Sequence, residues 1–296
     1  MDRKRLSARL GRIGVWTFLD RLPGDESVAF CERLEAQGYG ALWMPEAVGR
    51  DPFAQIGFLA ARTSRLVFAT GIANIYARDP MTMNAARKTL ADLTGGRFVL
   101  GMGVSHAPMV TGLRGHEYGK PVTTMRGYLE NMEKAPFQGH PPDEDAPLVL
   151  AALRKNMLGL ARDHAAGAHP YFTTPEHTAR AREILGPDRF LAPEQKLVLE
   201  TDPGRARTTA RRAMGMYLAL PNYRNNLLTL GFDESDFADG GSDRLVDAIV
   251  AWGDEQALAR RVQEHHDAGA DHVCIQPLAA DGLSQDLRIL EALAPR

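Results

Sequence analysis

The chain repeats one alternation along most of its length: a short apolar run is followed by a longer amphipathic stretch. Eight runs have the length and continuous hydrophobicity of strands that are buried on both faces. They are residues 12–16, 41–44, 66–72, 97–102, 148–152, 167–171, 196–200 and 271–277. Helical patterns follow at 25–37, 51–62, 79–93, 122–134, 155–166, 175–186, 203–219 and 254–268, and a last helix closes the chain.

This alternation predicts a parallel sheet, because each helix returns the chain to the start of the next strand. Eight units in 296 residues fit a closed α/β barrel of the (β/α)8 TIM type with insertions. An open doubly wound sheet is the alternative. We predict a single barrel domain over residues 1–296, with an irregular insertion near 221–250, where Asn, Gly and Asp are frequent.

Composition narrows the class of protein. The net charge of −2 provides no basic field for nucleic acid, and no run reaches the roughly 20 apolar residues that a membrane span needs. The two cysteines, Cys31 and Cys274, suggest a reducing compartment rather than a disulfide framework. The basic N-terminus lacks the apolar run of a signal peptide. We therefore expect a cytoplasmic protein, with residues 2–12 as a basic surface arm.

Polar residues at strand ends are the candidates for chemistry, because a TIM barrel places its active site there. The fourth predicted strand ends in Gly101-Met102-Gly103-Val104-Ser105-His106. The glycines indicate either a plain turn or a backbone that approaches a ligand closely. His106 and Glu46, which follows the second strand, are candidate acid/base groups. The residues alone leave the reaction open.

Several motifs of other enzyme classes are missing from the sequence. The nine histidines show neither a His-Glu-x-x-His spacing nor partners in a Cys-x-x-Cys pair, so we predict no metal site. The sequence has no Gly-x-Ser-x-Gly elbow and no Walker phosphate loop. Serine hydrolysis and phosphoryl transfer by a P-loop are therefore not expected.

Longer segments resemble the bacterial luciferase-like superfamily of flavin and deazaflavin oxidoreductases. The resemblance is carried by GYGALWMPE (38–46) and by the stretch 59–106, which contains Ala-Ala-x-Thr-Ser-Arg, Thr-Gly-Ile and Gly-Arg-Phe-x-Leu-Gly-x-Gly. Residues 152–171 and AGADHVCIQP (268–277) also fit. The match is most similar to an actinobacterial branch of coenzyme F420-dependent oxidoreductases.

The resemblance implies a barrel that binds coenzyme F420 at the C-terminal strand ends and transfers a hydride to or from a small organic substrate. It also implies a non-prolyl cis peptide at Gly71–Ile72, behind the deazaflavin ring. His106 occupies a position where some relatives carry glutamate, so it is the first candidate for the acid/base and Glu46 is the second. The predicted cofactor contacts are Trp16, Gly71, Ile72, Ala73, Asn74, Gly101, Gly103, Val104, Ser105, Arg154, His169, Pro170 and Tyr171. At Arg154 and Lys155 the sequence departs from its relatives, and these two cations could equally hold the cofactor phosphate or form a solvated helix start.

Two other functions stay open at this point. With FMN in place of F420, the protein would be a luciferase-like monooxygenase; without a cofactor, it would be a non-catalytic barrel that acts as a binding module. Barrels of this family commonly pair, so a homodimer is expected. Its apolar seam could be Phe53, Ile56, Phe58 and Leu59, although these residues fit the protein core equally well. Asn222 and Tyr223 are candidates for the substrate side.

Overall fold

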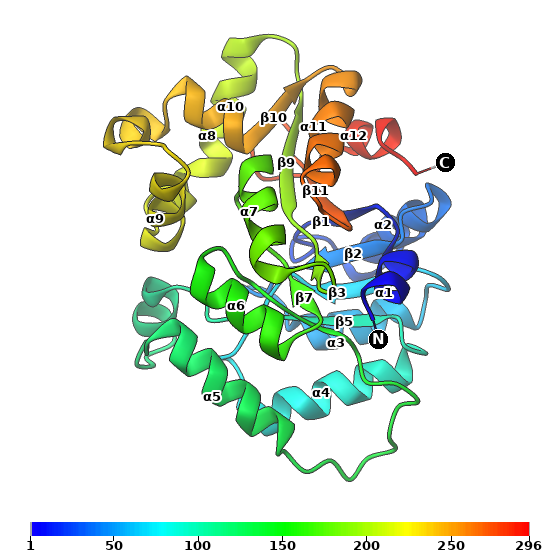
Figure 1. Ribbon diagram of the computed structural model, residues 1–296. Helices are drawn as coiled ribbons and strands as arrows, with labels where there is room; N and C mark the ends of the chain where they lie inside the picture. The colour runs from blue at the N-terminus through cyan, green and yellow to red at the C-terminus, as the bar shows by residue number, and fades with distance from the viewer. Residues whose placement is uncertain (1, 296) are drawn as a thin grey trace.

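The computed structural model describes residues 2–295, which form one large parallel sheet surrounded by helices (Figure 1). The strands are β1 (Ile13–Trp16), β2 (Ala41–Met44), β3 (Val67–Thr70), β4 (Ala73–Asn74), β5 (Phe98–Gly103), β6 (Leu148–Leu150), β7 (Gly167–Ala168), β8 (Phe190–Leu191), β9 (Glu194–Leu199), β10 (Val250–Gly253) and β11 (Val273–Pro277). Their order is β10-β9-β11-β1-β2-β3-β5-β6-β7-β8, with β4 paired to β5.

Residues 190–199 close the barrel. They form one extended segment that Pro193 divides into β8, which pairs with β7, and β9, which pairs with β11. The amide of Ala192 donates to Ala168, whereas the carbonyl of Pro193 accepts from Cys274. The predicted (β/α)8 barrel is therefore confirmed, with this segment as its seventh strand.

The helices lie outside the strands, as the amphipathic patterns predict. They are α1 (Arg3–Leu10), α2 (Gly24–Ala36), α3 (Pro52–Ala60), α4 (Pro80–Leu93), α5 (Pro121–Glu133), α6 (Lys155–His164), α7 (Pro175–Leu185), α8 (Pro203–Leu218), α9 (Pro221–Thr229), α10 (Asp243–Ile249), α11 (Glu255–Asp267) and α12 (Leu287–Ala292), with a π-helical turn η1 (Pro108–Leu113) and a 3-10 segment η2 (Glu234–Gly240). Asp51 and Asp79 cap α3 and α4 directly before the predicted prolines.

Two sequence-based expectations are wrong. Residues 221–249 are largely helical, and an additional strand that was not predicted, β10, follows them beside β9. Residues 2–12 do not form a surface arm, since α1 buries Leu6 and Leu10 completely. These two leucines belong to the same apolar cluster as the inward-facing Trp43 and Val99, so α1 plugs the N-terminal end of the barrel.

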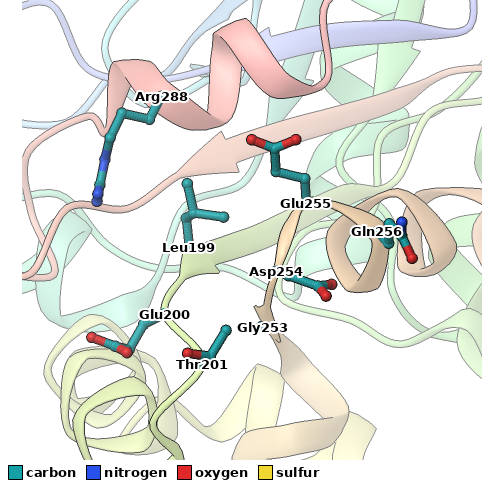
Figure 2. A pocket seen from close by; sticks show the side chains of 8 residues that line it. All are labelled: Leu199, Glu200, Thr201, Gly253, Asp254, Glu255, Gln256 and Arg288. Atoms are coloured by element: carbon teal, nitrogen blue, oxygen red, sulfur yellow. The ribbon is translucent and has the colours of Figure 1, made fainter.

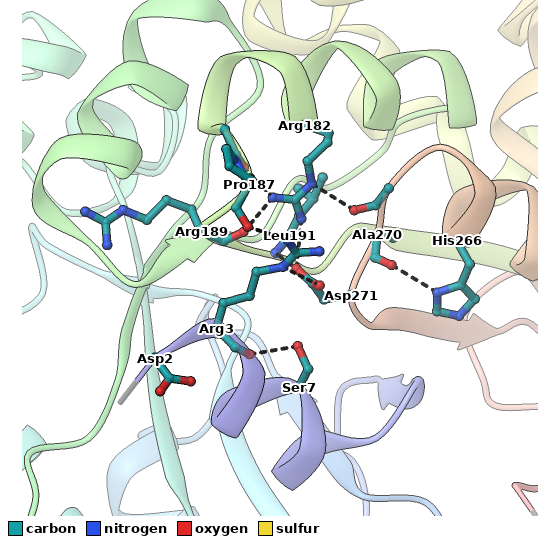
Figure 3. A network of polar contacts seen from close by, with 12 residues as sticks. Asp2, Arg3, Ser7, Arg182, Pro187, Arg189, Leu191, His266, Ala270 and Asp271 are labelled. Carbon is teal, nitrogen blue, oxygen red and sulfur yellow. Dashed lines mark hydrogen bonds and ion pairs between the residues drawn. The ribbon is translucent and has the colours of Figure 1, made fainter.

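Charged contacts anchor this plug (Figure 3). Asp271, just before β11, accepts from Arg3 of α1 at 2.8 Å and from Arg182 of α7 at 2.8 Å. The same carboxylate accepts the amide of Leu191 in β8 at 2.9 Å. Arg3 of the basic N-terminus thus holds α1 against the barrel, which the charge pattern alone did not reveal.

The predicted dimer seam is mostly internal. Ile56 and Leu59 are fully buried and Phe53 is 9% exposed, all in the protein's own core, while Phe58 is partly buried at its edge. Three of the four side chains are thus unavailable to a partner, and the alternative core assignment holds for them. No helix in residues 2–295 is long and apolar enough to span a membrane.

Candidate active site at the barrel mouth

The chain leaves β3 through a bulge, residues 71–74, at the C-terminal mouth of the barrel. The Gly71–Ile72 peptide is cis, as the resemblance implied. Ala73 and Asn74 then pair with β5 as β4. Within the bulge only Ile72 is half-buried, whereas its neighbours are buried. The bulge therefore offers a small apolar surface to the mouth.

Glycines in β5 accommodate this bulge. A Cβ at Gly101 would lie 2.0 Å from the Thr70 carbonyl oxygen, and one at Gly103 would lie 2.6 Å from Cδ1 of Ile72. The hydroxyl of Thr70 donates to the Gly101 carbonyl at 2.8 Å and accepts its amide at 2.9 Å. Gly101 is therefore required by backbone packing, whereas a side chain at Gly103 would displace the Ile72 side chain, so the glycine pattern does not by itself indicate a ligand.

Trp16 connects the bulge to the opposite wall of the mouth. Its Nε1 donates to the Gly71 carbonyl at 2.9 Å, and its ring lies 4.7 Å from that of Tyr171 after β7. Trp16 is 3% exposed. The predicted contact residues Trp16, Gly71 and Tyr171 are thus brought together by tertiary structure.

Glu46 is fully engaged below the bulge. It forms a bidentate pair with Arg78, with both nitrogen–oxygen distances 2.8 Å, and it also accepts the amide of Asn74 at 2.8 Å. Asp51 pairs with the same guanidinium. Because its oxygens are occupied by these donors, Glu46 is placed to hold the bulge rather than to exchange protons.

His106 follows β5, the strand that pairs with the bulge, and comes after Ser105, whose φ of 56° is in the left-handed region. The imidazole is partly buried, and this burial lowers the pKa of His106 below its usual value. Its ring is 5.3 Å from that of Tyr223, which α9 carries across from the insertion. His106 is therefore a neutral imidazole facing an aromatic wall.

Arg154 and Lys155 lie at the N-terminus of α6, at the end of β6. Both are exposed, and neither side chain has a hydrogen-bond or ion-pair partner within residues 2–295. The N-terminus of a helix favours an anion, and two free cations reinforce this preference. This is the one predicted contact region with surplus positive charge.

His169 does not reach the mouth. It is 1% exposed, its ring stacks on Trp43 at 4.5 Å, and its Nδ1 lies 2.7 Å from the Ala192 carbonyl. Burial lowers the pKa of His169 to about 4. The predicted cofactor contact at His169 is therefore not supported, because alternation along β7 turns this side chain into the barrel. Pro170 beside it is also buried.

A hollow of about 520 Å³ lies beside the mouth, at the ends of β9 and β10 (Figure 2). Three charged residues around it already have local roles: Glu200 pairs with Arg205, Arg288 pairs with Asp286, and Asp254 caps α11. None of the predicted site residues lines it. The described residues also contain no group of three or more His, Cys, Asp or Glu that could hold a metal.

The pattern analysis missed the charged interior of β9. Glu194 and Lys196 pair at 3.1 Å inside the barrel, each 1% exposed. Tyr171, Tyr217 and Tyr223 surround this region. Alternation along β9 was the available signal, because two charges two residues apart in a strand share a face.

Comparison with known proteins identifies relatives. Residues 10–186, more than half of the chain, match the luciferase-like monooxygenase family. A Mycobacterium tuberculosis protein, whose provisional name is coenzyme F420-dependent oxidoreductase Rv3520c, is 26% identical over 204 residues, or 59% of this chain and 58% of its own length. The 5,10-methylenetetrahydromethanopterin reductase of Methanolobus tindarius is 25% identical over 156 residues, or 47% of each chain. The matched regions thus span less than two-thirds of these relatives.

Solved structures share the fold at low identity. The coenzyme F420-dependent tetrahydromethanopterin reductase of Methanopyrus kandleri has a TM-score of 0.74 at 16% identity, covering 96% of this chain and 98% of that one. The FMN complex of the oxygenating component of 3,6-diketocamphane monooxygenase from Pseudomonas putida has a TM-score of 0.64 at 16% identity, covering 90% and 91%. The barrel and the bulge after β3 are consistent with the family match over residues 10–186. The chain therefore belongs to the luciferase-like monooxygenase family of oxidoreductases.

Proposed function

We propose that this protein is a coenzyme F420-dependent oxidoreductase that transfers a hydride between the deazaflavin and a small, uncharged organic substrate. The family membership and the F420-dependent relatives support the cofactor class. FMN is the alternative, since FMN-binding monooxygenases share the fold.

The observation that carries the proposal is the combination of three features at one mouth. Ile72 and the bulge provide an apolar shelf for a planar ring. His106 follows the neighbouring strand β5, and burial lowers the pKa of its imidazole. Arg154 and Lys155 provide unneutralised cations for a phosphate at the α6 N-terminus. The residues present therefore fit a flavin-like cofactor with an anionic tail.

When bound, the deazaflavin supplies the hydride chemistry at its ring carbon. The protein contributes position and a proton acceptor. Trp16 fixes the Gly71 carbonyl, and the Glu46–Arg78 pair holds the bulge from below. His106, uncharged near neutral pH, can accept the proton of an alcohol substrate or return it through an imidazolium.

The substrate class follows from the charges around the mouth. Glu46 and Lys196 are both neutralised by partners, and burial raises the pKa of Tyr223 well above its usual value, so its phenol stays protonated. Apart from Arg154 and Lys155, which we assign to the cofactor phosphate, the polar side chains discussed at the mouth are thus paired or uncharged. They suit an uncharged alcohol or ketone better than a carboxylate or a phosphate ester.

The test is a titration of the purified protein with F420 and with FMN, followed by an anaerobic hydride-transfer assay with secondary alcohols and with lactate. We expect selective F420 binding and turnover of the neutral alcohols. The variant His106→Gln should bind F420 normally but lose about 100-fold or more in turnover. His116→Gln, an exposed histidine nearby, is the matched control.

The outcomes separate the alternatives. Selective FMN binding with oxygen-dependent turnover would replace the proposal with a monooxygenase, and absence of binding to both cofactors would refute the cofactor assignment. Because burial lowers the pKa of His106, the rate of alcohol oxidation should fall only when the pH drops below the normal histidine value of 6.5.

A further inference from the structure

The Glu194–Lys196 ion pair inside the barrel has no role in the mechanism above. The Lys196 Nζ lies 3.1 Å from Oε1 of Glu194, and each side chain is 1% exposed. Gln195 between them faces outward to His265 of α11, so alternation turns both charges inward. In the register of the sheet, Lys196 lies beside Gln276 of β11.

A buried ion pair of this kind is a poor source of stability. Taking two charges out of water offsets most of their attraction, and apolar replacements are often neutral or stabilising. Desolvation acts on both groups here: burial raises the pKa of Glu194 and lowers that of Lys196. The pair therefore calls for an explanation other than folding stability.

The carboxylate of Glu194 holds the turn after β7. Its Oε2 accepts the amide of Phe172 at 3.1 Å. Phe172 has a φ of 58°, in the left-handed region that bulky residues avoid. The hydrogen bond thus supports an unfavourable backbone conformation next to Tyr171.

The ammonium of Lys196 holds the side chain of Tyr171. It lies 3.9 Å from the centre of the Tyr171 ring and 5.0 Å from that of Tyr217, within the range of cation–π attraction. The Tyr171 hydroxyl is 2.9 Å from that of Tyr217 and 3.1 Å from Oε1 of Gln276. Tyr171 is therefore fixed by its backbone, its ring and its hydroxyl.

Tyr171 in turn supports the bulge. Its ring packs 4.7 Å from Trp16, whose Nε1 donates to the Gly71 carbonyl at 2.9 Å. A continuous series of contacts thus runs from the buried ion pair through Tyr171 and Trp16 to the shelf proposed to carry the cofactor ring.

We propose that Glu194 and Lys196 are a positioning pair, which holds Tyr171 against Trp16 and thereby gives the mouth the shape that the cofactor ring requires. The inference rests on the proposed function for the identity of the ligand. Neither residue touches the reacting atoms; both act through Tyr171.

The test is the double variant Glu194→Leu/Lys196→Met, which removes both charges and leaves apolar side chains of similar size. The matched control, Lys88→Met with Asp145→Leu, removes the outer ion pair at 2.7 Å between α4 and the loop before β6. Thermal unfolding, the F420 dissociation constant and a crystal structure are measured for each protein.

We expect the control variant to unfold near the wild-type temperature and the barrel variant to stay folded but unfold at a lower temperature, because the buried Phe172 amide loses its acceptor. The F420 dissociation constant should rise about tenfold or more only for the barrel pair. In the crystal, Tyr171 should leave hydrogen-bond distance of Tyr217 and Gln276. If the Leu/Met variant fails to fold, Glu194→Gln/Lys196→Met takes its place, because the amide oxygen can still accept the Phe172 amide.

The structural result is independent of the cofactor. A folded variant with Tyr171 unmoved overturns the inference, whichever cofactor the wild type binds. Unchanged F420 affinity in a folded variant, beside a wild type that binds F420, also overturns it. Failure of the wild type to bind F420 instead refutes the proposed function, and the position of Tyr171 then decides the inference alone.

Discussion

The two halves of the barrel build their walls in different ways. In the half from β1 to β6, the residues facing inward are small or apolar, such as Ala69, Val99 and Val149. In the half from β7 to β11, inward positions include His169, Glu194 and Lys196. Both halves meet at the mouth, where Trp16 of the first contacts Tyr171 of the second.

The difference shows two physical ways to shape a site. In the first half, two backbone segments lie close together: glycines in β5 leave room for the bulge after β3. The second half uses buried polar groups, each of which needs a partner because desolvation is costly. The first half should therefore lose stability when a side chain is added at a glycine. The second half should lose stability when its buried polar groups change protonation.

Lowering the pH should destabilise the second half of the barrel more than the first. Burial lowers the pKa of His169, His177 and His272 to about 4 and that of His265 to about 3. Unfolded imidazoles titrate near 6.5, so between pH 6.5 and 4 the unfolded state binds more protons. Stability should therefore fall as the pH falls, by up to about 1.4 kcal/mol per pH unit for each imidazole.

Urea unfolding at several pH values measures this loss, which we expect to exceed about 5 kcal/mol between pH 6.5 and 5. His140→Gln is the control, since that side chain is 80% exposed and should leave the profile unchanged. A stability that stays constant down to pH 4.5 would contradict the assignment of neutral, buried histidines to the second half.

The glycine at position 101 tests the first half. In Gly101→Ala the new Cβ would meet the Thr70 carbonyl oxygen at 2.0 Å, a backbone atom that cannot move aside without distorting β3. We expect a loss of about 3 kcal/mol or more in the free energy of unfolding. Thermal and urea unfolding provide the measurement.

Gly127→Ala in α5 is the matched control, because no atom lies within 4 Å of the position that its added methyl group would occupy. Alanine is the better helix former, so this variant should gain about 0.5–1 kcal/mol. Equal stability of the two alanine variants would show that β5 does not need its glycines for packing.

The smallest expected change in stability concerns the contact between the halves. Trp16→Phe keeps an aromatic ring beside Tyr171 but removes the donor to the Gly71 carbonyl. The free energy of unfolding should decrease by about 1 kcal/mol, while F420 binding weakens because the bulge is less fixed. Trp252→Phe removes an indole donor in β10, remote from the bulge, and should leave F420 binding unchanged. If both variants bound the cofactor with equal affinity, Trp16 would have no role in cofactor binding.

Periodicity located eight strands and most helices, but it missed the short strands β4, β8 and β10. The runs at 41–44 and 271–277 correspond to β2 and β11, and the Asp-Pro starts of α3 and α4 appear where expected. The stretch 221–250 was harder, because its short helices lack a regular apolar pattern and depend on packing against α8 for stability. For the same reason, α1 appeared to be only a basic arm.

For the site, the sequence predicted the positions of several residues but not their contacts. The resemblance placed the cis bond at Gly71–Ile72, and it placed His106 at the mouth. The same reasoning could not show that Glu46 is saturated by Arg78 or that His169 turns inward. Contacts between residues that are distant in the sequence, such as Glu46 and Arg78 or His169 and Ala192, depend on how the strands are joined, and no local pattern contains that information.

The order of apolar and polar residues along the chain was thus sufficient for the barrel, since a period of two or of about 3.6 selects strand or helix locally. The closed sheet decided the remaining features of the site. It determined which charges are neutralised, which histidines are buried away from water and which rings meet across the mouth. Burial and pairing arise only when distant strands come together. They make Glu46 a partner of Arg78, His169 a packed ring and Lys196 a buried support.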